Sequence, residues 1–272
     1  MDDTAAGRRC ESAHLMLITP ERVFYAGLLG RPRQRCSGAF HVYVAIKGNL
    51  RLAPEGERES SGELLVAPPY LAHAVASDYR TVICVTLEPE TVRFGALDEL
   101  IGRLNGPDRS FFAHRIRAAY ADLLRHGFGR EITSAEFDRM FFGEALPART
   151  LDSRVRRAIA QITSFSGEPV TAAGCADAAG LSQSRFLHLF KEETGISFRS
   201  FRAWKRARHL LHYANQDLNL AHLAQDIGYP DSTHFSHSIR RFYGLKPRAI
   251  FSGSRDLAIY HGGRGTEDAA RS

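Results

Sequence analysis

The sequence contains little that would support membrane insertion, secretion or a metal centre. It has four cysteines in 272 residues, and because no two of them form a Cys-x-x-Cys pair, neither a zinc site nor a disulfide framework is expected. No segment approaches the roughly 18 unbroken apolar residues of a membrane-spanning helix, and the N-terminus lacks the apolar run of a secretion signal. These absences favour a cytoplasmic protein with reduced thiols and no membrane partner.

Positive charge is concentrated in the C-terminal part of the chain. Residues 149–255 contain 16 Lys and Arg against 8 Asp and Glu, whereas residues 1–148 contain 18 against 19. A localised basic domain is typical of proteins that bind the phosphate backbone of nucleic acid, although basic domains also bind membranes and acidic proteins.

The N-terminal part is typical of a small β-rich domain. Residues 41–52 read as a hairpin rich in β-branched and aromatic side chains, and further strands are predicted at 62–67 and 79–87. Short strands at this spacing predict a barrel or sandwich within about residues 15–90.

The apolar pattern becomes helical beyond about residue 95. Apolar residues recur at three- and four-residue intervals in 112–123 and, after Ser134 as the predicted N-cap, in 137–141. Two helices are therefore expected within residues 95–145. Their apolar faces suit either burial against the strands or pairing with a second chain, and both alternatives stay open.

Pro147 marks the predicted domain boundary, because it interrupts the helical pattern and the basic segment begins just beyond it. The chain then divides into a first domain at residues 1–147, a second at 148–255 and a C-terminal tail at 256–272.

The second domain contains the same pattern twice. In each copy a short helix ends at a glycine, a tight turn follows, and a second helix carries apolar residues four apart before another glycine. The defining residues are Gly180, Phe186, Phe190 and Gly195 in the first copy and Gly228, Phe235, Ile239 and Gly244 in the second. This pattern predicts two helix-turn-helix units, the second with a turn one residue longer.

The second helix of each unit leaves a polar face opposite its apolar residues. Hydroxyl and imidazole groups suit base edges, cationic groups suit phosphate, and Leu187 suits a thymine methyl. The residues predicted to contact double-stranded DNA are Ser184, Arg185, Leu187, His188 and Lys191 in the first unit and Ser232, Thr233, Ser236, His237 and Arg240 in the second.

A long helix over Ser197–Ala214 is predicted to join the two units and to hold both recognition helices on one side of the DNA. Its apolar residues Phe201, Trp204 and Leu211 are expected to pack against both halves. Its basic residues are expected to remain solvated, with Arg206 among the DNA contacts; they are Arg202, Lys205, Arg206 and Arg208.

Two stretches of this domain, GLSQSRFLHLFKEETGISF and LAQDIGYPDSTHFSHSIRRFYGLKPRAI, resemble the signature regions of the AraC/XylS family of transcription regulators. The resemblance implies an α+β protein with a cupin-like β-barrel and helices, followed by an all-α domain of two helix-turn-helix units joined by a long helix. It further implies a sequence-specific transcription regulator, commonly an activator. Its partners would be promoter DNA, a small-molecule effector and RNA polymerase.

The first unit departs from the family pattern. Gly174 and Cys175 stand where a leucine-containing helix is usual, and the run Ala172-Ala173-Gly174 forms helix weakly. We therefore expect the first unit to be less rigid. Ile239 replaces the family's usual phenylalanine, which is a mild change in packing.

Residues 62–73 resemble the turn-and-strand signature of the family's effector domain, which often dimerises. An inner barrel face that includes Arg35, His41, Tyr43 and His73 would suit a small polar or acidic effector. The alternative for each of these residues is a place at the rim or on the surface.

Two other functions compete with this one. A metal-dependent cupin enzyme with a DNA-binding appendage would use His41, His73 and Glu63, but metal cupins place two histidines one residue apart and His41 is followed by Val42 and Tyr43. There is also no Gly-x-Ser-x-Gly nucleophile motif. We therefore expect no enzyme activity, no metal and no cofactor. The second alternative is a regulator that responds to no effector.

Overall fold

The chain forms two compact units in a computed structural model that describes residues 14–128, 132–164, 170–252 and 257–262. Residues 1–148 together with 254–272 make the N-terminal unit, and residues 149–253 make the C-terminal unit. Within the described ranges, none of the helices has both the length and the apolar content needed to cross a bilayer.

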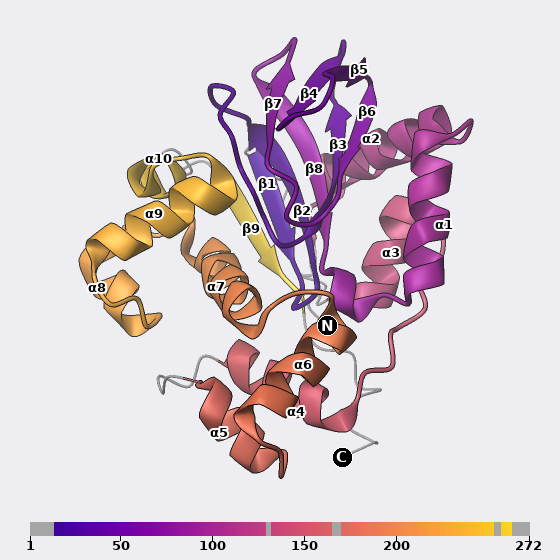
Figure 1. Ribbon diagram of the computed structural model, residues 1–272. Coiled ribbons are helices and arrows are strands. Elements are labelled where there is room, and N and C mark those ends of the chain that lie inside the picture. The colour runs from indigo at the N-terminus through magenta and orange to yellow at the C-terminus, as the bar shows by residue number, and fades with distance from the viewer. Residues whose placement is uncertain (1–13, 129–131, 165–169, 253–256, 263–272) are drawn as a thin grey trace, which may run out of the picture. The chain divides into compact units, whose positions relative to one another are not determined.

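The N-terminal unit contains two β-sheets (Figure 1). The six-stranded sheet has the order β6-β3-β8-β2-β1-β9 and consists of β1 (His14–Ile18), β2 (Arg22–Leu28), β3 (Phe40–Ala45), β6 (Leu64–Ala67), β8 (Thr81–Leu87) and β9 (Leu257–His261). The three-stranded sheet has the order β5-β4-β7 and consists of β4 (Leu50–Pro54), β5 (Ser60–Gly62) and β7 (His73–Ser77).

The hairpin predicted at residues 41–52 is wrong, because β3 and β4 belong to different sheets. β3 pairs with β6 and β8, which occupy both of its edges, and β4 pairs with β5 and β7. The turn between them crosses from one sheet to the other. Gly48 has φ +73° there, a conformation that glycine adopts readily, and the backbone N–H of Asn49 donates to Asp78 Oδ2 at 2.9 Å.

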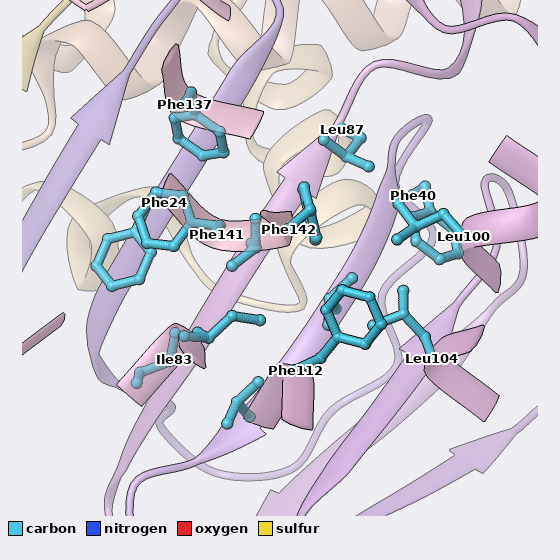
Figure 2. Close-up of a cluster of buried hydrophobic side chains, with 14 of the residues drawn as sticks. Phe24, Phe40, Ile83, Leu87, Leu100, Leu104, Phe112, Phe137, Phe141 and Phe142 are labelled. Carbon is cyan, nitrogen blue, oxygen red and sulfur yellow. The ribbon is translucent and has the colours of Figure 1, made fainter. Parts of the chain in front are cut away.

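Side chains alternate between the two faces of the large sheet, as the strand period of two requires. One face packs against the helices α1 (Phe94–Asn105), α2 (Arg109–His126) and α3 (Ser134–Phe142), with Phe24 and Phe40 of the sheet in the same core as Phe112 and Phe141 (Figure 2). A short 3-10 helix at Pro89–Thr91 precedes α1. The other face contributes to a second core with the smaller sheet.

The apolar face predicted at residues 112–123 is buried in this core. Phe112 and Ile116 are fully inaccessible to solvent, so burial accounts for the stripe and these side chains are not left for a second chain. The N-cap of α3 is Thr133 rather than the predicted Ser134, because the Thr133 hydroxyl accepts from the Glu136 N–H while the Glu136 carboxylate accepts from the Thr133 N–H.

Part of the predicted C-terminal tail is a strand of the N-terminal unit. β9 pairs in parallel with β1, with Leu257 opposite His14 and His261 opposite Ile18. Leu257 is buried, and the ring of Tyr260 contacts that of Phe128. This pairing connects residues far apart in the sequence, so local pattern carries no signal for it.

The C-terminal unit is entirely helical. It consists of α4 (Ser153–Ser164), α5 (Ala172–Ala178), α6 (Gln183–Thr194), α7 (Phe198–His209), a 3-10 turn (Leu210–Tyr213), α8 (Leu220–Asp226), α9 (Ser232–Tyr243) and α10 (Pro247–Ser252). Helix α7 contributes Phe198 and Phe201 to the core of the first half, while Trp204 packs against Phe242 at 5.4 Å between ring centroids. The predicted connecting helix therefore joins both halves, although its last turn is 3-10.

Candidate nucleic-acid interface and effector site

The two helix-turn-helix units, α5–α6 and α8–α9, are each closed by caps and by a left-handed glycine. Gly180 and Gly228 have φ +64° and +81°, which permits the reversal between the helices. Ser182 caps α6 by accepting from the Arg185 N–H at 3.3 Å, and Asp231 caps α9 by accepting from the His234 N–H at 2.8 Å. Such caps satisfy backbone donors that a helix start leaves unpaired.

The helix α5 forms in spite of its weak sequence. The hydroxyl of Thr171 accepts from the Gly174 N–H at 3.1 Å and supplies the N-cap, while Cys175 and Ala176 are buried against the first-half core. Capping and packing thus offset the low propensity of the Ala-Ala-Gly run, and the first unit has the same helical elements as the second.

Both recognition helices bury one face and expose the other. Phe186 and Phe190 of α6 and Ile239 of α9 are fully buried. All the residues predicted to contact DNA on α6 and α9 are exposed apart from Ser236, which is half-buried. Leu187 is 36% exposed and is one of the few large apolar side chains on the surface, which an apolar contact with a base would explain.

Two exposed residues at the starts of these helices are not among the predicted DNA contacts. Gln183 is the first residue of α6 and is exposed, and glutamine suits adenine edges. His234 is exposed in the first turn of α9, but its Nδ1 lies 2.8 Å from Asp231 Oδ2, so it supports the cap. The position of Gln183 directly after the capping Ser182 could have identified it as the first residue of the recognition helix.

The basic residues of α7 are less solvated than predicted. Lys205 and Arg208 are each only 5% exposed, because the long aliphatic stems of such side chains pack between helices. Arg206 is half-buried with its guanidinium over the Tyr229 ring at 5.2 Å, and burial lowers the pKa of Arg206. Arg206 thereby supports the turn before α9, and a DNA contact by Arg206 stays a prediction.

A polar cluster lies on the face of the large sheet turned away from α1–α3. Alternation along β3 and β8 puts His41 and Tyr43 beside Thr86 and Cys84, which are their partners across the ladder. His41 Nδ1 lies 3.2 Å from Thr86 Oγ1, and the other ring nitrogen bonds Ser37. The Tyr43 hydroxyl lies 3.0 Å from Nε2 of His73 on β7. The structure therefore brings together His41, Tyr43 and His73.

Arg35, the fourth residue of the predicted effector site, joins the same cluster. Its backbone forms two hydrogen bonds of 2.9 Å with that of His73, and its charge affects the pKa of both His41 and Tyr43. Burial lowers the pKa of His41 well below 6.5 and also lowers that of His73. Burial raises the pKa of Cys84 to about 11. These neighbours are therefore uncharged near neutral pH.

Glu63, the third ligand of the metal alternative, is held by other groups. Its carboxylate bonds Arg117 Nη1 and the Ser110 hydroxyl, each at 2.8 Å, and the Arg117 bond is the main cause of a lowered pKa of Glu63. Nothing in the described residues places this carboxylate with His41 and His73.

Comparison with known proteins relates the C-terminal unit to transcription regulators. Residues 175–252 match the family described as a helix-turn-helix domain. The HTH-type transcriptional activator RhaS of Escherichia fergusonii is 33% identical over 111 residues, which cover 40% of this chain. The match spans only 39% of the length of RhaS.

Among solved structures, ToxT from Vibrio cholerae has a similar architecture over most of its length. A 1.65 Å structure of ToxT gives a TM-score of 0.52 at 12% identity and covers 85% of this chain and 97% of ToxT. A ToxT structure bound to (E)-4-(8-methylnaphthalen-1-yl)but-3-enoic acid gives 0.52 at 11% identity, covering 85% of this chain and 98% of ToxT. This likeness concerns fold alone, and it confirms the predicted α+β class with a β-rich N-terminal unit and a helical C-terminal unit.

Proposed function

We propose that the C-terminal unit is an AraC/XylS-type tandem helix-turn-helix domain and that the protein is a sequence-specific regulator of transcription that binds promoter DNA. One observation carries the proposal. Two capped recognition helices, α6 and α9, each expose a polar face opposite a buried apolar pair, and they lie in one unit rich in Lys and Arg.

In this function the exposed faces of α6 and α9 enter successive major grooves, which repeat about every 34 Å along one side of B-DNA. Short hydroxyl and imidazole side chains read base edges, while the cations Lys191 and Arg240, nearer the C-terminal ends of the helices, bind phosphate. The proposed DNA contacts are Ser184, Arg185, Leu187, His188, Lys191, Arg206, Ser232, Thr233, Ser236, His237 and Arg240.

The N-terminal unit is proposed to sense a small molecule through Arg35, His41, Tyr43 and His73. Two findings support this role: these side chains meet between the sheets, and a ToxT structure of similar fold holds a small organic ligand. Activation, rather than repression, is proposed because RhaS is named as an activator.

Selection of binding fragments from a random DNA pool by the full chain tests this function. We expect two conserved sequence blocks about 10–10.5 base pairs apart. The paired variant Arg185→Ala, His188→Ala should relax one block only, and Ser236→Ala, His237→Ala should relax the other. His114→Ala, an exposed histidine on α2, is the matched control.

Failure to enrich any sequence would exclude a sequence-specific regulator. If only one block were enriched, and the variant Arg185→Ala, His188→Ala enriched the same block, base reading by the first unit would be excluded.

A further inference from the structure

One edge of the Arg35 guanidinium is buried without a protein counter-ion, although the residue as a whole is half-buried. Its Nε and Nη2 atoms are inaccessible to solvent and have no hydrogen-bond partner. Within the described ranges, no ion pair joins Arg35 to an Asp or Glu. A buried polar group that stays unsatisfied is uncommon in folded proteins and costs free energy, more so when it is charged.

The groups around Arg35 do not neutralise its charge. The side chains whose pKa its charge affects are Tyr25, His41, Tyr43, His73 and Cys84. Burial raises the pKa of Tyr25 to about 12 and lowers that of His41, so none of the five carries a negative charge near neutral pH. A hydrogen bond to Tyr43 is a contact with a neutral group.

A buried arginine of the same unit, Arg22, shows what satisfies this edge of a guanidinium. Arg22 is 2% exposed, and its Nε and Nη2 atoms donate to Oδ1 and Oδ2 of Asp138 at 2.8 and 3.1 Å. These two donors lie on one side of the planar group and match the two oxygens of one carboxylate. Arg35 presents the same pair of atoms, and no carboxylate of the described chain meets them.

We propose that the Nε and Nη2 edge of Arg35 is the receptor for the carboxylate of a small monocarboxylic acid. This rests on the proposed role of the N-terminal unit as a sensor, and it specifies the class of ligand. One guanidinium balances a single negative charge, which favours a monocarboxylate over a phosphate ester. Tyr43, which interacts with Arg35, belongs to a core that includes Leu29, Leu52 and Val75, so these surroundings favour an acid with an apolar body.

Thermal unfolding of the full chain tests the proposal, with sodium benzoate and sodium octanoate as probes. Benzamide and octanamide are the neutral counterparts, and sodium chloride matches the ionic strength. We expect at least one carboxylate to raise the unfolding temperature of the wild type by about 3 °C or more at tenfold excess over its Kd. The amides should have no effect.

Two variants of Arg35 make the test specific. Arg35→Met removes the unpaired charge and keeps an apolar side chain of similar length, so it should unfold at a higher temperature than the wild type without probe and should not respond to carboxylate. Arg35→Lys keeps the charge but loses the paired donors, so its Kd for the carboxylate should rise at least tenfold. Arg33→Met, at an exposed position in the same segment, should respond as the wild type does.

Three results would overturn the proposal. The first is a lower unfolding temperature of Arg35→Met without probe. The second is an equal response of the wild type to carboxylates and amides. The third is no response of the wild type to either carboxylate at about 20 mM, well above a millimolar Kd. DNA binding, measured by fluorescence anisotropy on the same preparations, separates this inference from the proposed function. A carboxylate response without DNA binding would support carboxylate binding at Arg35 and would exclude the proposed function as a DNA-binding regulator.

Discussion

Replacing Arg240 should weaken DNA binding without changing sequence preference. Replacing Ser236 and His237 should instead relax sequence preference. Arg240 is exposed in the last turn of α9, on the face opposite the buried Ile239 and Phe242. Loss of one phosphate contact lowers the slope of log K against log salt by about 0.9. Between 50 and 200 mM salt, the affinity of Arg240→Ala should therefore fall about 3.5-fold less than that of the wild type.

The paired variant Ser236→Ala, His237→Ala should keep the wild-type salt slope. Its discrimination against a mismatched base should drop by about 1–3 kcal/mol, or roughly 5- to 150-fold. Fluorescence anisotropy on the selected site and on one with a single mismatch, at four salt concentrations, measures both quantities. Arg80→Ala removes an equal charge from an exposed position in the N-terminal unit and serves as the control. An unchanged salt slope for Arg240→Ala together with relaxed preference would refute the assignment of roles along α9.

Three further outcomes are expected. Trp204→Ala should lower the free energy of unfolding of the C-terminal unit by about 3–5 kcal/mol in urea titrations, because Trp204 is buried against Phe242. Deletion of residues 254–272 should destabilise the N-terminal unit by about 2 kcal/mol or more, since it removes β9 and its buried Leu257; unchanged thermal unfolding would contradict this. The N-terminal unit should also lose stability as the pH falls below 6.5, because the unfolded chain protonates His41 and His73 while the folded unit keeps them neutral. The loss should reach at most about 1.4 kcal/mol per histidine and pH unit. In urea titrations between pH 5.5 and 7.5, His41→Gln should lose less stability than the wild type.

The helix-turn-helix units could be predicted because their signals are local. A glycine, a capping residue and apolar residues four apart all lie within some 20 positions of one another, and each acts on the backbone next to it. Gly180 and Gly228 have the left-handed φ that their place in the pattern requires. The same locality explains why the one-residue difference between the two turns was visible from the sequence.

Long-range features could not be predicted in this way. The turn at residues 47–49 looks like a hairpin turn, but whether β4 returns to β3 depends on β6 and β8, which already occupy both edges of β3. The parallel pairing of β9 with β1 closes a loop of more than 200 residues and has no local cause. The charged residues of α7 were also predicted incorrectly. Lysine and arginine are usually exposed, but Lys205 and Arg208 are buried, as the long aliphatic stems of such side chains permit.

Both ends of the C-terminal unit continue into backbone that is anchored in the N-terminal unit. On the entry side, the Leu146 N–H donates to Asp138, the Arg93 N–H donates to Pro147, and Ala148 bridges to Val92. On the exit side, β9 lies along β1. The C-terminal unit is thus joined covalently to the N-terminal unit at both of its ends. A ligand bound at Arg35, whose backbone bridges to His73 of the smaller sheet, would have these two covalent connections through which to influence α6 and α9 under the proposed function.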